Sequence, residues 1–429
     1  MEKVRIAILG FGNIGTGVWK ILKENKKEIT KRSNYEIEVA KILVKDINKK
    51  RDIAVPSGIL TDNIDDIIND DSIKIVVELI GGPSEAKDYM IRAMKAKKHI
   101  VTANKLVIAN YGKELFKIAE KENVLFYYEA SVAGGIPIIR EIKESLTGNR
   151  IEQIIGIING TTNYILSKMT NDGVSFNEAL KEAQEKGYAE ADPTSDVDGY
   201  DAVYKLAIMA SLSFGTEVNY DCIYREGIRN ISDIDIEYAK QFGYAIKLLA
   251  IAKEKNNKLE LRVHPTLVPA NHPMANVNDA FNAILIKGNA VGELMLYGKG
   301  AGDLPTGSAV VGDIISILRN NIKPSDINKI AAELDFKEVK KSEENESEFY
   351  IRLDFKDKAG VLGDTAAIFA SNNVSIVSIT QDVEHKAHST LAFITHKSTE
   401  KNIENSLKRI IKLDSVNKVE SKIRIESFN

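Results

Sequence analysis

Residues 4–15 read VRIAILGFGNIG, and this stretch decides the fold expected of the first part of the chain. A short apolar run, Val4 to Leu9, ends in a GxGxxG string and is followed by apolar residues at helical spacing. Glycines at such positions permit a tight turn and let main-chain amides approach a pyrophosphate at a helix N-terminus. The stretch therefore predicts a dinucleotide-binding strand, turn and helix, with a plain packing turn as the alternative. The predicted cofactor loop consists of Gly10, Phe11, Gly12, Asn13, Ile14 and Gly15.

Apolar runs and helical patterns alternate along the following residues, which predicts a parallel sheet covered by helices. Predicted strands lie at 37–44, 75–80, 99–102 and 124–129, and predicted helices at 86–98, 112–122 and 309–318. The pattern then changes to a second α/β domain, a polar linker and a βαββαβ order typical of a ferredoxin-like fold. The expected domains are 1–135, completed by about 301–322, then 136–300, a linker at 339–347, and 348–429.

Composition limits the class of protein. The 429 residues are 44% hydrophobic and 28% charged, as in globular chains, and the net charge of -3 leaves no excess of cations for nucleic acid. One cysteine, Cys222, cannot form a disulfide within the chain, and no apolar run approaches the roughly 18 residues of a spanning helix. We therefore expect a cytoplasmic protein with no nucleic-acid or membrane partner.

Residues 186–205, KGYAEADPTSDVDGYDAVYK, carry the strongest chemical signal. Asp201 and Lys205 stand four apart at the start of a helix that is apolar almost all round, and a buried charge is costly unless it is paired or used. This favours a functional role over a surface ion pair. A hydride leaving an alcohol needs a base for the hydroxyl proton, and lysine can serve. Lys105 follows a strand at the edge where ligands bind, with an exposed loop cation as the alternative.

Two further segments leave alternatives open. Lys45 and Asp46 end the second predicted strand before the cations at 49–51, so a basic contact to a 2′-phosphate competes with an acidic contact to a ribose. The cluster favours NADP with dual use, and a solvated basic loop is the alternative. Adjacent glycines within 129–137 suit a hinge or a monovalent cation held by carbonyl oxygens, and the residues alone favour the hinge.

The chain resembles the homoserine dehydrogenases along nearly its whole length. The resemblance is carried, in family order, by GFGNIG, VVELIGG, TANK, SVAGGIP, NGTTNYIL, KGYAEADPTSDVDGYDAVYK and GKGAGDLPTGSAVVGD. It implies reversible NAD(P)-dependent interconversion of L-homoserine and L-aspartate 4-semialdehyde, in the pathway to threonine, methionine and isoleucine. A dehydrogenase of another amino acid or semialdehyde is disfavoured by KGYAEADP, and a non-catalytic amino-acid sensor by the intact lysines and carboxylates.

Residue roles follow from this resemblance. Lys205 resembles the family's proton donor and acceptor, Lys105 assists at the same oxygen, and Glu190 and Asp201 hold the substrate. The family's sodium site, made largely of main-chain oxygens, falls on Glu129, Val132, Gly134 and Ile136, which replaces the hinge interpretation. The residues expected near the nicotinamide end are Thr102, Lys105, Gly187 and Gly302.

The tail resembles an ACT domain, an amino-acid-sensing fold that commonly pairs with a second copy. Its strand-to-helix turn has Ala359 before Gly360 where many members have proline, which makes the ligand loop less stiff. By resemblance we expect L-threonine as feedback inhibitor and a homodimer or homotetramer. We also expect a monofunctional enzyme with no aspartate kinase segment, because the first strand begins within a few residues of Met1.

Overall fold

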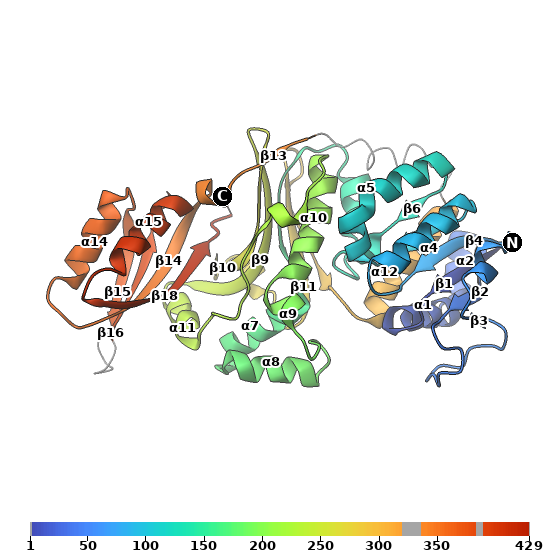
Figure 1. Cartoon of the computed structure of the whole chain (residues 1–429), viewed down its shortest axis with the longest axis horizontal. Helices are drawn as coiled ribbons and strands as arrows, with labels where there is room; N and C mark the ends of the chain where they lie inside the picture. Colours follow the sequence, from blue (N-terminus) through green and yellow to red (C-terminus); the bar gives the residue numbers. More distant parts are fainter. Residues whose placement is uncertain (1, 320–335, 383–388, 429) are drawn as a thin grey trace. The chain divides into compact units, whose positions relative to one another are not determined.

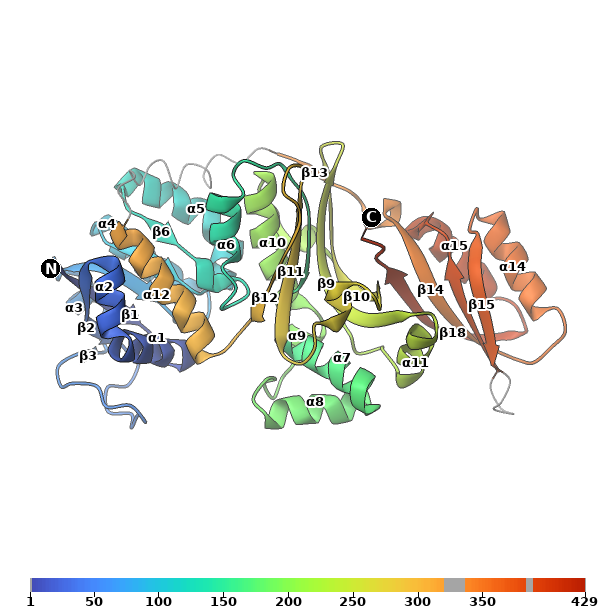
Figure 2. The same cartoon turned by 180° about the vertical axis from the view of Figure 1, so that it is seen from behind.

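The computed structural model describes residues 2–319, 336–382 and 389–428. These residues form two compact units, each assembled from segments that are distant in the sequence, and Figures 1 and 2 show their elements from two sides. Unit 1 comprises Met1–Glu152, Tyr204–Tyr220 and Ile284–Lys337. Unit 2 comprises Gln153–Val203, Asp221–Ala283 and Glu338–Asn429. The domain boundaries expected from the sequence stay predictions.

Unit 1 is organised around a six-stranded sheet in the order β3-β2-β1-β4-β5-β6, in which every neighbouring pair is parallel. The strand order reverses between β1 and β4, and open sheets of this kind bind ligands where the strands end beside that reversal. The Rossmann-type sheet expected from the sequence is therefore confirmed. Its strands are β1 (Glu2–Leu9), β2 (Tyr35–Leu43), β3 (Leu60–Thr61), β4 (Ile73–Glu78), β5 (His99–Thr102) and β6 (Phe126–Tyr127).

The core of unit 1 joins the two ends of its sequence. Ile6 and Ile8 of β1 are fully buried, and Val310 and Ile314 of α12 lie in the same apolar cluster. Each such side chain stabilises the fold by about 1.5–3 kcal/mol. Figure 2 shows α12 beside α1. The helices of unit 1 are α1 (Asn13–Glu24), α2 (Lys26–Ser33), α3 (Asp65–Ile68), α4 (Ser84–Lys95), α5 (Lys105–Glu122), α6 (Ile138–Arg140) and α12 (Asp303–Arg319).

Two helices of unit 1 begin earlier than the sequence suggested. α12 starts at Asp303 instead of 309, because Pro305 falls in its first turn, where the missing N–H is not needed for a helical bond. α5 starts at Lys105 instead of 112, because the Asn104 side chain accepts a hydrogen bond from the amide of Val107 and caps the helix. The second difference moves Lys105 from a loop to a helix terminus.

The sheet of unit 2 runs in the order β7-β9-β10-β18-β14-β16-β15. The hairpin of β9 and β10 turns at Asn256 and Asn257, whose φ values of 54° and 60° are those of a tight hairpin turn that matches strand twist. Parallel pairing of β10 with β18 then joins the last strand of the chain to this hairpin. The strands are β7 (Ile151–Ile157), β9 (Tyr244–Lys255), β10 (Lys258–Pro269), β14 (Glu346–Phe355), β15 (Ile376–Asp382), β16 (Ser389–Thr395) and β18 (Val416–Ile425), and shorter strands are β8 (Tyr224–Arg225), β13 (Glu338–Val339) and β17 (Ser398–Thr399).

The C-terminal part of unit 2 has the predicted ferredoxin-like order. Its strands pair antiparallel in the order β18-β14-β16-β15, and two helices bury Phe369 and Ile403 against them. Among the described residues, no helix combines the length and apolarity needed to cross a membrane. The helices of unit 2 are α7 (Gly160–Asp172), α8 (Phe176–Glu185), α9 (Thr194–Val197), α11 (Asp233–Gln241), α14 (Val361–Ser371) and α15 (Glu400–Ile410). Helix α10 (Tyr200–Phe214) and the hairpin of β11 (Phe281–Gly288) and β12 (Gly292–Lys299) contribute residues to both units.

A buried ion pair ties the ferredoxin-like part to the rest of unit 2. Arg352 of β14 donates to Asp235 of α11 at 2.8 Å, and the Tyr350 hydroxyl donates to the same carboxylate at 3.2 Å. Asp235 has no exposed surface and also accepts from Ser232 at the start of its helix. Removing one partner of such a pair leaves an uncompensated buried charge.

We predict that Asp235→Ala lowers the free energy of unfolding of unit 2 by about 3–5 kcal/mol, because Arg352 remains buried without its carboxylate. Asp233→Ala, at an exposed position of the same helix, is the matched control and should change stability by less than about 0.5 kcal/mol. Urea unfolding followed by circular dichroism measures both. Equal effects of the two variants would contradict the assignment.

Candidate active site

The GxGxxG loop joins β1 to α1 as the sequence predicts. Gly10 has φ 95°, and a Cβ atom on Gly15 would lie 2.3 Å from the carbonyl oxygen of Gly10, so the turn requires glycine at both positions. A Cβ on Gly12 would meet nothing within 4 Å, so the space before the helix is open. Within the described residues, no side chain caps the N-terminus of α1, which leaves the amides of Asn13 and Ile14 available to a phosphate. The loop therefore fits a dinucleotide.

Three segments far apart in sequence meet beside this loop. A Cβ on Gly17 would lie 2.1 Å from the carbonyl oxygen of Asp303, and Lys20 pairs with the Asp303 carboxylate at 3.3 Å. A Cβ on Gly134 would lie 2.5 Å from the carbonyl oxygen of Gly300. Gly302, which has φ 122°, lies within the third of these segments. The structure thus brings the predicted cofactor loop, the glycines at 134–135 and the 299–303 turn into one region of unit 1.

A hydrogen-bonded chain spans the ends of β4 and β5. The Glu78 carboxylate accepts from the Thr102 hydroxyl at 2.6 Å and from the amide of Ile80 at 2.7 Å. The Thr102 hydroxyl in turn accepts from the amide of Asn104, whose side chain caps α5. This chain connects Glu78 to the capped helix terminus that carries Lys105.

Burial changes the acidity of Glu78. The side chain has no exposed surface, and this desolvation raises the pKa of Glu78 to about 7 against the hydrogen bonds that favour its charged form. A carboxyl that titrates near neutrality, close to the edge where the strands end, is the kind of group found at functional sites.

The two lysines that the sequence selected both lie in unit 1. Lys105 is the first residue of α5, and Lys205 lies in the second turn of α10. Both side chains take part in interactions within the fold. Around Lys205, α10 is buried as predicted, since Ala202, Leu206 and Met209 have almost no exposed surface.

Part of the 186–205 segment is held by one asparagine in unit 2. The Asn159 side chain donates to Asp196 at 2.7 Å and to Asp201 at 2.8 Å, and its carbonyl oxygen accepts from Thr162. Asp201 is only 3% exposed. A single amide therefore orients two carboxylates, which is a site suited to a small cation such as an ammonium group.

Gly187 and Glu190 belong to the loop after α8. Gly187 has φ 73°, which favours glycine, and Glu190 is exposed. The loop is tied down by Thr161, whose hydroxyl donates to the carbonyl of Tyr188 at 2.6 Å, and by Gln184, whose amide donates to the carbonyl of Glu190 at 3.1 Å. The carboxylate of Glu190 is thus carried by a loop anchored to the helix that Asn159 caps.

The segment 129–136, expected from the resemblance to bind a cation, has two different parts. Both carboxylate oxygens of Glu129 accept from main-chain amides, those of Ile139 and Arg140, at 2.7 and 2.8 Å. In contrast, Ala133 and Gly134 have φ values of 53° and 50°, which turns consecutive peptide groups in the loop. In the part of the chain that the structure describes, nothing donates a hydrogen bond to the carbonyls of Val132 or Gly134, and no group of three or more His, Cys, Asp or Glu is arranged to hold a metal. Main-chain oxygens therefore fit a monovalent cation better than the carboxylate does.

A second buried acid supports this segment. Asp313 of α12 accepts from the amide of Glu129 at 2.9 Å and pairs with Arg140 at 3.3 Å. Full burial, together with the neighbouring Glu129, raises the pKa of Asp313 to about 8.

The basic loop after β2 is exposed. The Asp46 carboxylate accepts from the amide of Asn48, and Arg51 donates to the main-chain carbonyls of Asp46 and Lys49 at 2.7 Å each. Lys45 is exposed at the start of this loop. The acid and the arginine thus shape the loop itself.

Sequence reasoning missed Glu78, Asn159 and Asn104 as contributors to the site. Each stands inside a motif that was noted for its family resemblance. The two asparagines were detectable as helix caps, because asparagine directly before a helical segment is a start signal. The contacts of Glu78 with Thr102 and of Asn159 with Asp201 were not, because these partners lie in another strand or helix.

Family models match most of the chain. The model of the homoserine dehydrogenase NAD binding domain matches residues 10–129, that of homoserine dehydrogenase matches 137–315, and that of the ACT domain matches 349–415.

Named relatives match over full length. The chain is 42% identical to a homoserine dehydrogenase of Neisseria gonorrhoeae, covering 100% of both chains, and 39% identical to that of Bacillus subtilis, covering 99% of both. Among solved structures, a homoserine dehydrogenase from Thiobacillus denitrificans has a TM-score of 0.93 at 41% identity, covering 100% of this chain and 99% of that one. A hyperthermophilic archaeal homoserine dehydrogenase in complex with NADPH has a TM-score of 0.63 at 28% identity, covering 75% and 99%.

We predict that Glu78→Gln changes the pH dependence of unit 1. The native pKa of about 7 exceeds the ordinary value of 4.5, so the native state binds more protons between these values and wild-type stability falls as pH rises through them. The glutamine variant has no carboxyl at this position and does not lose stability in this way. The free energy of unfolding of the variant minus that of wild type should therefore rise by about 3 kcal/mol from about pH 4 to about pH 8.

Thermal unfolding followed by the fluorescence of Trp19, the single tryptophan and a neighbour of Phe11 in unit 1, measures this difference. Glu24→Gln, at an exposed position of α1, is the control. A pH-independent difference between wild type and Glu78→Gln would show that Glu78 does not titrate in this range.

Proposed function

Since the chain belongs to the homoserine dehydrogenase family, we propose that it interconverts L-homoserine and L-aspartate 4-semialdehyde, with Lys205 as the group that moves the substrate proton. It is an oxidoreductase that acts on a CH–OH group and binds NAD(P). The observation that carries the assignment of residues is the start of α10, which presents Lys205 one turn after an Asp201 that Asn159 holds in place.

Lys205 exchanges a proton with the substrate oxygen in both directions of the reaction. When bound, the nicotinamide would supply hydride to the substrate carbon or accept it from there. During oxidation, the neutral Lys205 amine takes the hydroxyl proton of homoserine as the carbonyl forms. During reduction, the Lys205 ammonium returns that proton to the oxygen of the semialdehyde. Lys105, at the first position of α5, adds a positive charge that stabilises negative charge developing on the same oxygen.

Asp201 and Glu190 bind the other end of the substrate. Carboxylates form charge-assisted hydrogen bonds with an α-ammonium group, and both residues belong to the motif that follows α8. Asn159 adds precision, because it fixes the rotamer of Asp201 and brings Asp196 to the same amide. The substrate is thereby oriented with its terminal carbon away from the carboxylates.

The cofactor is NADP, with NAD as a weaker alternative. Lys45 and the neighbouring cations at 49–51 stand where a 2′-phosphate is recognised in such folds, while the Asp46 carboxylate accepts a hydrogen bond from its own loop. The related archaeal enzyme in complex with NADPH supports this preference.

A sodium ion would be held chiefly by the carbonyl oxygens of the 132–136 loop, where two left-handed residues turn the peptides. Glu129 would contribute through its main chain, because helix amides already use its carboxylate. The cation would stabilise the packing of this loop against the 299–303 turn.

Regulation completes the proposed function. The ACT domain responds to L-threonine as a feedback inhibitor of the pathway to threonine, methionine and isoleucine, and the chain assembles as a homodimer or homotetramer. The ACT match and the left-handed Gly360 that opens α14 support an amino-acid-responsive fold.

We predict that Lys205→Ala lowers kcat by about 10²–10⁴-fold, because the substrate oxygen loses its proton donor and acceptor, while the Kd for NADP changes little. The readout is the initial rate of NADP reduction by L-homoserine, with Lys181→Ala at an exposed position of α8 as the control. An unaltered kcat in Lys205→Ala would remove this lysine from the mechanism.

We predict that Asp201→Asn and Glu190→Gln raise the KM for L-homoserine by about tenfold or more each, since a charge-assisted hydrogen bond to the ammonium is lost. Asp192→Asn, in the same loop, is the control. If KM stays the same in both variants while kcat falls, these carboxylates do not bind the substrate.

A further inference from the structure

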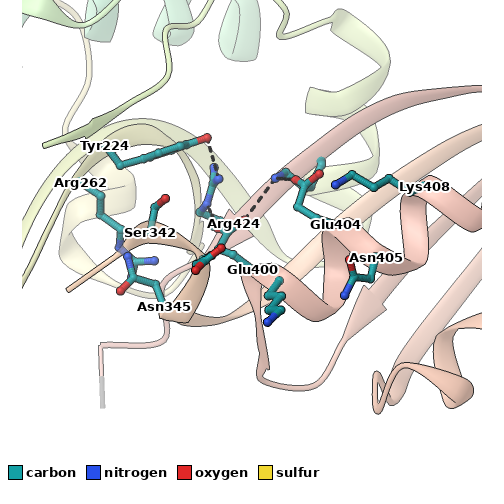
Figure 3. Close-up of a pocket in the computed structure, with 12 residues that line it drawn as sticks. Tyr224, Arg262, Ser342, Asn345, Glu400, Glu404, Asn405, Lys408 and Arg424 are labelled. Carbon is teal, nitrogen blue, oxygen red and sulfur yellow. Dashed lines mark hydrogen bonds and ion pairs between the residues drawn. The ribbon is translucent and has the colours of Figure 1, made fainter. Parts of the chain in front are cut away.

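Unit 2 contains a cavity of about 370 Å³ that lies apart from the motifs described above (Figure 3). One wall is the face of α15 that carries Lys401 and Lys408, and another is β18 with Lys422 and Arg424. The segment 342–345, Tyr224 of β8 and Arg262 of β10 also line the cavity. The cavity therefore lies between the ferredoxin-like part of unit 2 and strands β8 and β10.

The inner charges of this cavity are paired. Arg424 donates to Glu226 at 2.8 Å, to the Tyr224 hydroxyl at 2.9 Å and to Glu400. Lys422 pairs with Glu400 at 3.2 Å. Figure 3 shows Arg424 in the middle of this network with the Tyr224 hydroxyl turned toward it.

The outer charges are not paired. Lys401, Lys408 and Glu343 make no ion pair with any described residue. In addition, Nε of Arg262 and Oδ1 of Asn345 are buried without a hydrogen-bond partner among the described residues, although each residue is about 3% exposed. Buried polar atoms normally have partners, so these two indicate a missing polar ligand or water.

The lining selects the chemistry of the occupant. Cationic donors and a carboxylate with an amide oxygen face the same space, so the unused groups can bind both a negative and a positive charge. We propose that this cavity is an effector site for a small α-amino acid. Its carboxylate is bound by Lys401 and Lys408, and its ammonium by Glu343 and Asn345. The inference rests on the proposed function, because it assumes regulation by an amino acid. It places the effector site in this cavity and not at the strand-to-helix turn at 357–361.

Strand β8 links the cavity to residues 198–200, which directly precede Asp201. Tyr224 and Glu226 face Arg424, and Arg225 between them points to the other side. There the Arg225 guanidinium lies 3.6 Å from the centre of the Tyr200 ring and donates to the carbonyl of Asp198. Lys401 and Lys408 lie on α15 with Glu400, which pairs with Arg424. An occupant that shifts α15 therefore moves Arg424, and through Glu226 the strand that holds residues 198–200.

The residues after β8 pack closely against Val197. A Cβ on Gly227 would lie 2.4 Å from the carbonyl oxygen of Val197, and the amide of Ile228 donates to that carbonyl at 2.8 Å. Asp201 follows three residues after Asp198. A shift of β8 thus changes the position of the Asp201 carboxylate, which we propose binds the substrate. This gives a physical route for inhibition.

The test compares the full-length chain with Lys401→Met/Lys408→Met. Isothermal titration calorimetry with L-threonine, L-methionine and L-isoleucine measures binding, and the rate of NADP reduction by L-homoserine measures inhibition. We expect at least one amino acid to bind wild type, and the double variant to weaken it by about tenfold or more. Lys412→Met, at an exposed position just after α15, should bind like wild type.

Two further arms separate the alternatives. Lys358→Met, in the strand-to-helix turn, should retain binding, and loss of binding there with retention in the double variant would overturn the proposal. Inorganic phosphate should not compete with the amino acid, and saturation by phosphate alone would also overturn it. Because calorimetry needs no turnover, failure of the site and failure of the proposed reaction give different results.

Arg225→Leu tests the link. It should leave the amino acid's Kd within about twofold of wild type while the amino acid's effect on the KM for L-homoserine disappears. Inhibition that persists unchanged in this variant would show that β8 does not transmit it.

Discussion

Main-chain contact at glycine is the constraint on which unit 1 depends. Gly15 lies against the carbonyl of Gly10, Gly17 against that of Asp303, and Gly134 against that of Gly300, each closer than a Cβ atom would allow. These contacts let segments from the start, the middle and the later part of the chain meet where the strands of the parallel sheet end. The N-terminus of α1 and the turned peptides at 133–134 lie at these contacts. Because the contacts are between backbones, no side-chain rearrangement can replace them.

Unit 2 is specified by buried charge. Arg352 with Asp235 and Arg262 with Glu426 are buried pairs that connect the ferredoxin-like part to α11 and β10. The buried Arg424 connects it to β8, because it pairs with Glu226 and donates to the Tyr224 hydroxyl. Such pairs add little net stability compared with apolar packing, but a misaligned arrangement leaves charges unpaired. We infer that they select one alignment of β18 beside β10, where only two residue pairs join the strands. Of these charged residues, Arg262 and Arg424 also line the cavity proposed as an effector site.

Much of this architecture could be predicted from the sequence, and the reasons are local. The glycine string, the alternating apolar runs and the βαββαβ order each act over a few residues, so periodicity and turn chemistry were sufficient. The start of α5 at Lys105 was missed although Val107 and Ile108 already lie on the buried face of the helix, because Asn104 was not used as a start signal. The role of Glu78 was missed because its partners come from another strand, and the polar run at 339–347 was expected to be a linker although its 342–345 part lines the cavity. The division of labour among Lys205, Lys105 and Glu190 remains a prediction, since roles depend on a bound substrate.

The most direct test of the account is the initial rate of nicotinamide reduction by L-homoserine, run with NADP and NAD in parallel and repeated in the reverse direction with L-aspartate 4-semialdehyde. The account predicts turnover in both directions with a higher kcat/KM for NADP. It also predicts a much lower rate when L-serine replaces L-homoserine, because serine has one methylene fewer between its ammonium group and its hydroxyl. A folded, cofactor-binding protein that turns over neither substrate in the presence of sodium would contradict it.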